Sequence, residues 1–285
     1  MLIGNAPCSW GVCYPTGNIY SPEQYLDQLA SAGYKGTELG PLGYMPTDVD
    51  RLKNMLVPHN LTLIGATHVH TFSQAETNVQ FHKDMRAQGE VLSALGARHL
   101  VVMDESNVYP ADQLGVLSHD AVQQMYKDLS KAHTMLANEF GIALSFHPHI
   151  GTCIELEAQI DALLSETPLN LCLDTGHYAF WGQDPLTYMR RNWDRIDYMH
   201  LKNVDASVRT RVLRGDLSVQ DALGAGVMCP LQEGVVDIAQ IMEFLRANEF
   251  QGPVVVEQDI AENAIETPLE LACRNFSYIA GMAEA

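Results

Sequence analysis

The chain has 285 residues, of which 47% are hydrophobic and 18% charged, a composition typical of a globular protein with a sizeable core. Its formal net charge is −18, from 35 acidic and 17 basic residues, and no Lys/Arg-rich stretch offsets it, so we expect no nucleic-acid partner. No run of about 18 apolar residues predicts a membrane span and no secretory leader is apparent, so we expect a cytoplasmic protein without a membrane partner. The six cysteines form no C-x-x-C pair and are expected to be reduced.

Short apolar runs alternate with amphipathic helical patterns along the whole chain. The runs are continuously apolar, which is typical of parallel strands covered on both faces. Residues 25–40, 92–104 and 244–259 share one construction, in which a helix ends near a glycine and an apolar run follows that leads into an acidic residue. Read in this way, the chain predicts eight strands, near residues 2–7, 35–40, 61–67, 98–104, 141–147, 169–174, 196–202 and 253–258.

Eight strand–helix units are the number that closes a (β/α)8 TIM barrel, so we expect an α/β fold of this type with one domain over residues 1–285. Residues 203–235 are predicted to form an insertion after the seventh strand, serving as a lid or as a contact in a homo-oligomer. Barrel enzymes build their sites at the C-terminal ends of the strands. Polar residues at those ends are the site candidates: Trp10, Glu38, His68, His70, Asp104, Glu105, His147, His149, Asp174, His177, His200, Lys202, Glu257 and Asp259.

The last four strands each offer an imidazole or a carboxylate at this end. Residues two apart in a strand point the same way, which pairs His147 with His149 if the strand continues that far. Two histidines, an aspartate and a glutamate that converge there make a mixed nitrogen and oxygen ligand set for a divalent ion. For Asp174 a helix N-cap is the alternative role, whereas Glu257, after a buried strand, needs a charged or metal partner. A single histidine in such a place is often a hydrogen-bonded structural residue.

Other candidate residues have more than one interpretation. Glu38 could hold substrate or cap a loop, and Trp10 could stack on a sugar ring or be an ordinary loop aromatic. Lys202 could be a substrate-binding cation, the catalytic acid or a salt-bridge partner. No G-x-G-x-x-G or G-x-x-x-x-G-K-[ST] pattern occurs, so nothing indicates a dinucleotide or a phosphate-binding loop.

Seven motifs, in order from Pro7 to Asp259, resemble those of a known family. They are CSWGV, AGYKGTELGPLGYMPTD, FHPHIGT, LCLDTGHYAFWG, MHLKNVD, CPLQEGVVD and VVVEQD. Together they are similar to the inosose dehydratase branch of the xylose isomerase-like barrels, a group that also contains keto-sugar isomerases and epimerases. The resemblance covers almost the whole chain.

The resemblance implies one divalent metal ion. Manganese and cobalt are the preferred ions, and magnesium, iron and zinc are alternatives. The metal ligands it implies are His147, Asp174, His200 and Glu257, although His147 and His149 could be exchanged. It also implies a set of residues that contact the substrate or line its pocket: Trp10, Glu38, His149, His177, Lys202 and Glu233.

One position departs from the epimerases of this group, which have a glutamate where this chain has His147. Epimerisation uses two opposed acid/base groups, whereas dehydration needs one base alpha to a ketone and one acid for the departing hydroxyl. We therefore expect a metal-dependent lyase that dehydrates a keto-polyol, 2-keto-myo-inositol above others, with keto-sugar isomerisation or epimerisation through an enediolate as the alternative. Glu257 or His147 would take the proton, and His177 or His149 would protonate the leaving hydroxyl.

Two further function classes are weighed against this hypothesis. The zinc endonucleases of the same barrel group share the DTGH motif at Asp174 and His177, but they carry a D-x-H segment that this chain lacks, and the net charge of −18 disfavours them. A sugar-binding or metal-storage protein would keep a pocket without convergent acid/base groups. The expected partner is therefore a small keto-polyol or sugar.

Overall fold

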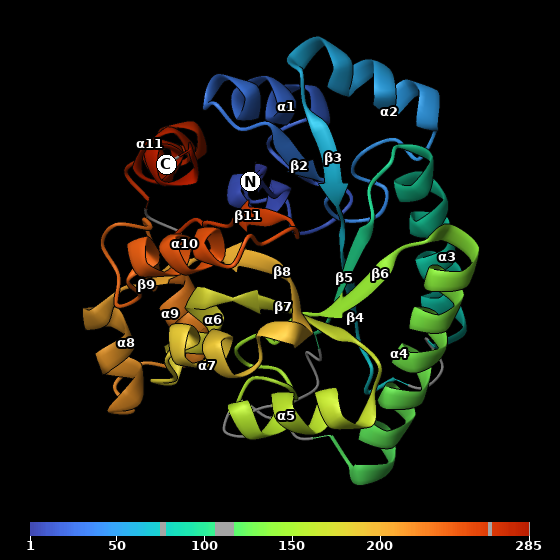
Figure 1. Cartoon of the computed structure of the whole chain (residues 1–285). Helices are drawn as coiled ribbons and strands as arrows, with labels where there is room; N and C mark the ends of the chain where they lie inside the picture. The colour runs from blue at the N-terminus through green and yellow to red at the C-terminus, as the bar shows by residue number, and fades with distance from the viewer. Residues whose placement is uncertain (75–77, 106–116, 262–263, 285) are drawn as a thin grey trace.

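The computed structural model describes residues 1–74, 78–105, 117–261 and 264–284. Its centre is a sheet of nine parallel strand segments in the order β3-β2-β1-β11-β8-β7-β6-β5-β4, surrounded by helices (Figure 1). No described helix combines the length and the apolar character needed to cross a bilayer. The segments are β1 Ile3–Asn5, β2 Gly36–Glu38, β3 Thr62–Gly65, β4 Thr67–His70, β5 His99–Asp104, β6 Ala143–Phe146, β7 Asn170–Asp174, β8 Ile196–Leu201 and β11 Val254–Val256.

The two ends of this sheet belong to one continuous stretch of chain. β3 pairs with β2, β4 pairs with β5, and only Ala66 separates them. The Val101 N–H donates to the Ala66 carbonyl at 2.8 Å, so the third strand bridges both ends and the ring closes. The predicted TIM barrel is confirmed, with one correction: the strand predicted over 61–67 continues to His70, because each half pairs with a different neighbour.

Helices follow the strands and cover the outside of the barrel (Figure 1). Local sequence sets their ends: Ser21 and Gln24 form a capping box at the start of the first helix, and Gly141 ends the fourth in a left-handed conformation with φ of 65°. The helices are α1 Pro22–Ser31, α2 Val49–Leu56, α3 Asn78–Ala94, α4 His119–Phe140, α5 Glu157–Glu166, α6 Thr175–Phe180, α7 Pro185–Arg191, α10 Ile238–Ala247 and α11 Pro268–Glu284.

The barrel interior changes from apolar to polar along its axis. Its apolar layer is made of small and β-branched side chains with one tyrosine, namely Ala6, Ile64, Val101, Cys172, Tyr198 and Val255. Residues further along the same strands, such as Asp174 on β7 and His200 on β8, are polar and buried. The apolar layer thus forms the floor beneath the polar end.

The segment after β8 forms a small substructure that packs on the barrel. It contains β9 Asn203–Val204 and β10 Met228–Cys229, which pair antiparallel, and the helices α8 Ala206–Leu213 and α9 Val219–Gly224. Val212, Ala222 and Val227 form its core with Ile150, which follows β6, and Phe180 of α6. The predicted insertion over 203–235 therefore packs against the C-terminal end of the barrel, and its role as lid or oligomer contact stays a prediction.

Asn203 is expected to hold this segment in place. Its buried side chain donates to the carbonyls of Leu231 and Val236 at 2.7 and 2.9 Å and accepts from the N–H groups of Val204 and Val236 at 2.9 and 2.8 Å. Asn203→Ala leaves these groups unpaired at about 1–3 kcal/mol each, so we expect the unfolding temperature to fall by at least about 5 °C. Calorimetry checks this against Asn248→Ala, which removes an exposed side chain; equal unfolding temperatures for both variants would contradict it.

Candidate functional site

A cavity of about 680 Å³ opens at the C-terminal end of the barrel. Residues after β6, β8 and β11 line one side of it, among them His147, Lys202 and Glu257. Residues at the ends of β4 and β5, including His68 and Glu105, line another part. The cavity thus lies where the barrel fold predicts an active site.

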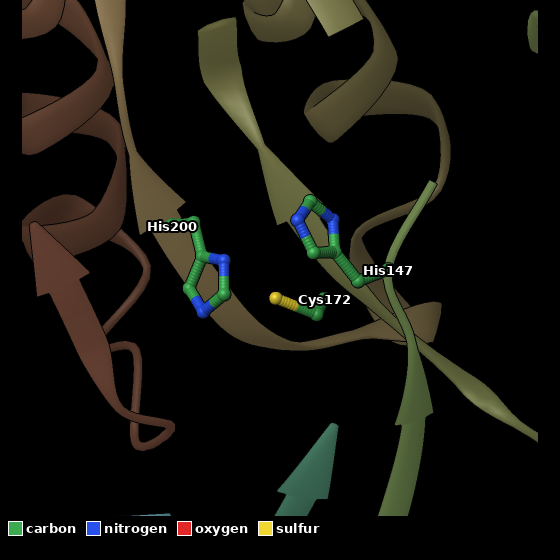
Figure 2. Close-up of side chains that lie close together, drawn as sticks. All are labelled: His147, Cys172 and His200. Atoms are coloured by element: carbon green, nitrogen blue, oxygen red, sulfur yellow. The ribbon is translucent and has the colours of Figure 1, made fainter. Parts of the chain in front are cut away.

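Four of the predicted residues meet at this end of the barrel, and two of them, His147 and Glu257, line the cavity. His147 follows β6, Asp174 ends β7, His200 lies on β8 and Glu257 follows β11. One nitrogen or oxygen atom from each lies within 4.8 Å of those of the other three, and all four side chains are buried. Figure 2 shows the imidazoles of His147 and His200 turned toward one another, with ring centroids 4.9 Å apart.

The hydrogen bonding of these residues fits a metal centre. Among the described residues, His147 Nδ1, Asp174 Oδ2 and His200 Nδ1 are buried without a hydrogen-bond partner. Buried polar atoms rarely stay unpaired, and two imidazole nitrogens with two carboxylates suit a divalent ion. Asp174 Oδ1 accepts from the N–H groups of Gly176 and His177 at 2.8 Å, so Asp174 caps α6 with one oxygen and offers the other to the centre.

Lys202 places a buried positive charge beside this centre. Its Nζ lies 2.9 Å from Glu257 Oε2, 3.3 Å from Asp259 Oδ2 and 3.6 Å from Asp174 Oδ2. Burial alone would lower the pKa of Lys202, but these carboxylates outweigh it and hold the pKa above its usual range. Nζ also lies 3.0 Å from His177 Nε2, so the ammonium group stands between a carboxylate and an imidazole.

Three imidazoles at this end, those of His147, His149 and His177, are neutral near pH 7. Burial and the charge of Lys202 lower the pKa of His149 to about 4, and burial likewise lowers the pKa of His147 and His177 well below their usual range. The rings of His149 and His177 contact each other with centroids 3.8 Å apart, and His149 Nδ1 bonds to the Ile150 carbonyl at 2.9 Å. Neutral imidazoles can bind a metal or exchange a proton with a substrate.

Glu38 lines the cavity, but its hydrogen bonds indicate a positioning role. Oε1 accepts from the Tyr198 hydroxyl at 2.8 Å and lies 3.0 Å from His200 Nε2, while Oε2 accepts from the Thr67 hydroxyl at 2.8 Å. Because a carboxylate facing Nε2 favours a proton there, a neutral His200, the form that can bind a metal ion, would have its lone pair on Nδ1. The sequence analysis missed Tyr198, although its spacing of two from His200 on one strand could have indicated it.

The structure does not bring Trp10 and Glu233 to the cavity. Trp10 is 3% exposed, packs against Tyr25 in the core and donates from Nε1 to Gln28 at 2.7 Å. Glu233 lies after β10 and pairs with Arg274 at the surface. Neither is among the described residues that line the cavity, so their predicted contact with substrate has no support from their positions.

Comparison with known proteins agrees with this architecture. Residues 26–274 match the model of a family described as xylose isomerase-like TIM barrel. The chain belongs to this family. The match covers all strands of the barrel after β1 and all four residues of the centre.

Individual known proteins are similar to this chain over most of their length. The rhizopine catabolism protein MocC of Rhizobium meliloti is 32% identical over 279 residues, which cover 92% of this chain and 82% of that protein. The inosose dehydratase of Geobacillus thermodenitrificans is 30% identical over 292 residues, covering 97% and 95%. Among solved structures, IolI with a bound zinc atom has a TM-score of 0.75 at 13% identity, covering 99% of this chain and 98% of that one, which shows a shared fold.

Proposed function

We propose that this protein is a divalent-metal-dependent dehydratase of a cyclic keto-polyol, with 2-keto-myo-inositol as the first candidate substrate. The convergence of His147, Asp174, His200 and Glu257, two of which line the cavity, carries the proposal. Relatives named inosose dehydratase align with almost the entire chain, which supports the same reaction class. Histidine at position 147, where the epimerases of the family have glutamate, favours elimination over epimerisation.

The four residues of the centre would hold the metal ion, through Nδ1 of His200 and Oδ2 of Asp174 among others. The bound zinc of IolI supports a divalent ion, and we propose manganese or cobalt for this chain. When bound, such an ion polarises a ketone and the hydroxyl beside it. Two of the residues that would hold it, His147 and Glu257, also line the cavity in which the substrate ring would lie.

Glu257 is the proposed base for the proton alpha to the ketone. Burial alone would raise its pKa, but the charges of His200 and Lys202 outweigh burial and hold the pKa of Glu257 well below its usual range, so the carboxylate is ionised near pH 7. The C–H bond breaks as the proton moves to Glu257, and the C–O bond breaks as the hydroxyl leaves. The product is an enol, which becomes the dione.

The imidazoles of His177 and His149 are the proposed acids for the leaving hydroxyl. His177 Nε2 faces the Lys202 ammonium group at 3.0 Å, which puts the ring proton of a neutral His177 on Nδ1. That proton goes to the hydroxyl as the Lys202 ammonium group donates a proton to Nε2, and water leaves. Lys202 lies 2.9 Å from Glu257 and 3.0 Å from His177, so the proton taken by the base has a route back to the acid.

A proton NMR time course in D2O with added Mn²⁺ tests this function, using 2-keto-myo-inositol and, separately, a ketohexose such as fructose or tagatose. Appearance of a dehydrated dione from the inosose supports the lyase. Deuterium incorporation with a new sugar and no loss of water would instead support the isomerase or epimerase alternative and contradict the role given to His147. Tight sugar binding without any product under any metal would support a binding protein.

Replacing Glu38 by glutamine is expected to weaken Mn²⁺ binding by about 10–100-fold, because a neutral amide oxygen is a weaker acceptor for His200 Nε2–H than a carboxylate and fixes the imidazole tautomer less firmly. Calorimetric titration of the purified protein measures this without substrate. Tyr198→Phe is the control, since it removes a donor to Glu38 and leaves the Glu38–His200 contact. Unchanged metal affinity with a raised KM would show that Glu38 binds substrate instead.

A further inference from the structure

A thiol lies beside the two imidazoles of the centre. Cys172 is on β7, two residues before Asp174, and points into the barrel. Its Sγ and one nitrogen each of His147 and His200 all lie within 4.8 Å of one another, and all three residues are buried. Figure 2 shows the sulfur between the two rings.

The two imidazoles therefore have two different sets of neighbours. The carboxylates of Asp174 and Glu257 form one set, and the sulfur of Cys172, which lies in the apolar layer with residues such as Tyr198, forms the other. Nδ1 of His147 and Nδ1 of His200 have no hydrogen-bond partner among the described residues. Two buried imidazoles beside a thiol supply the ligand types of a two-histidine, one-cysteine metal site.

We propose that His147, Cys172 and His200 form a second, sulfur-side metal position that binds thiophilic ions such as Zn²⁺ and Cd²⁺. Thiolate ligands select soft ions, whereas the carboxylate side suits harder ions such as Mn²⁺. On binding, the S–H bond of Cys172 breaks, the proton leaves to the buffer and a metal–sulfur bond forms. Because both positions use the same two imidazoles, one ion excludes the other.

This inference extends beyond the proposed reaction, because it concerns which ions the protein binds and what they displace. An ion on the sulfur side would occupy His147 and His200 without engaging both carboxylates. Such an ion would compete with the ion of the carboxylate side. Thiophilic metals are therefore expected to be competitive inhibitors with respect to Mn²⁺.

Cadmium titration of the purified protein tests the proposal without substrate. Cys8 and Cys13, which line the cavity, are replaced by alanine in every sample so that no other thiol of the cavity competes. Ultraviolet absorption then reports cadmium–thiolate bonds, and calorimetry in two buffers of different ionisation enthalpy reports proton release. Cys172→Ala and Cys172→Val are compared with Cys229→Ala, which changes another buried cysteine.

We expect a thiolate band with Cys172 present and its loss in both Cys172 variants, with Cd²⁺ affinity reduced by at least about tenfold and one proton fewer released. Cys229→Ala should behave as the parent. A band that persists in Cys172→Val, or Cd²⁺ binding without a band in the parent, would overturn the proposal. Loss of Mn²⁺ affinity equal to that of Cd²⁺ would also overturn it, because one shared centre would then contain the sulfur. If neither variant folds, the presence or absence of cadmium–sulfur bonds in the X-ray absorption spectrum of the parent decides.

Discussion

Glu257→Gln is expected to reduce turnover of the keto-polyol substrate by at least about a thousandfold, the scale at which removal of an acid/base group acts. Two effects combine, because the amide cannot accept the substrate proton and it is a weaker ligand than a carboxylate. The loss of charge also leaves the Lys202 ammonium, 2.9 Å away, without its nearest partner. Initial rates measured over a range of Mn²⁺ concentrations check the prediction and separate metal affinity from turnover.

Glu155→Gln is the matched control for this variant. Glu155 is also buried at the C-terminal end of the barrel, but it accepts from the Gly151 N–H and the Trp181 indole and takes no part in the centre. A similar loss of turnover in both variants would indicate a general effect of altering buried glutamates. Parent activity in Glu257→Gln at saturating metal would refute the role of Glu257 as base.

Lys202→Met is expected to lower turnover by about 10²–10⁴-fold while Mn²⁺ affinity stays equal or increases. Lys202 faces His177, so its loss interrupts the path between base and acid. At the same time it removes a positive charge 2.9 Å from Glu257 and 3.6 Å from Asp174, two residues that would bind the ion. A fall in turnover without a fall in Mn²⁺ affinity distinguishes this variant from Glu257→Gln, in which both fall.

Stability gives a second measure of the same substitution. Without the ammonium group, buried carboxylates lose their partner, a change that typically costs about 3–5 kcal/mol. The unfolding temperature of Lys202→Met should therefore fall in the presence of a chelator and recover when Mn²⁺ is added. Lys35→Met, which changes an exposed lysine, should show neither effect. A Lys202→Met variant with parent turnover would contradict the proton path.

The sequence was sufficient to predict the barrel because apolar runs and helix ends are local patterns. The same runs, with the two-residue period of strands, predicted that residues 147, 174, 200 and 257 lie at one end of the barrel. In the structure, one ligand atom from each of these residues lies within 4.8 Å of those of the other three. The role of Glu38 could not be predicted from such local patterns. It depends on Thr67, Tyr198 and His200, which come from other strands and meet Glu38 only when the ring closes.

Trp10 and β4 show two further limits of local patterns. A tryptophan beside a strand end looks the same in sequence whether it faces a cavity or packs into the core, and here Tyr25 and Gln28 of α1 hold it in the core. The extension of the third strand to His70 depends on pairing with β5, a partner that lies about thirty residues further along the chain. Such outcomes follow from contacts between distant segments.

The bridge formed by the third strand has a consequence for how copies of the protein can meet. An open sheet ends in two strands whose N–H and C=O groups are free to pair with another chain, which invites domain swapping and amyloid-like stacking. In this barrel β3 and β4 join those two ends, and the Val101–Ala66 hydrogen bond spans the junction. Self-association through the barrel sheet would require the hydrogen bonds between two of its strands to break first. Contacts between copies that involve the barrel would therefore use the surfaces of its helices and loops.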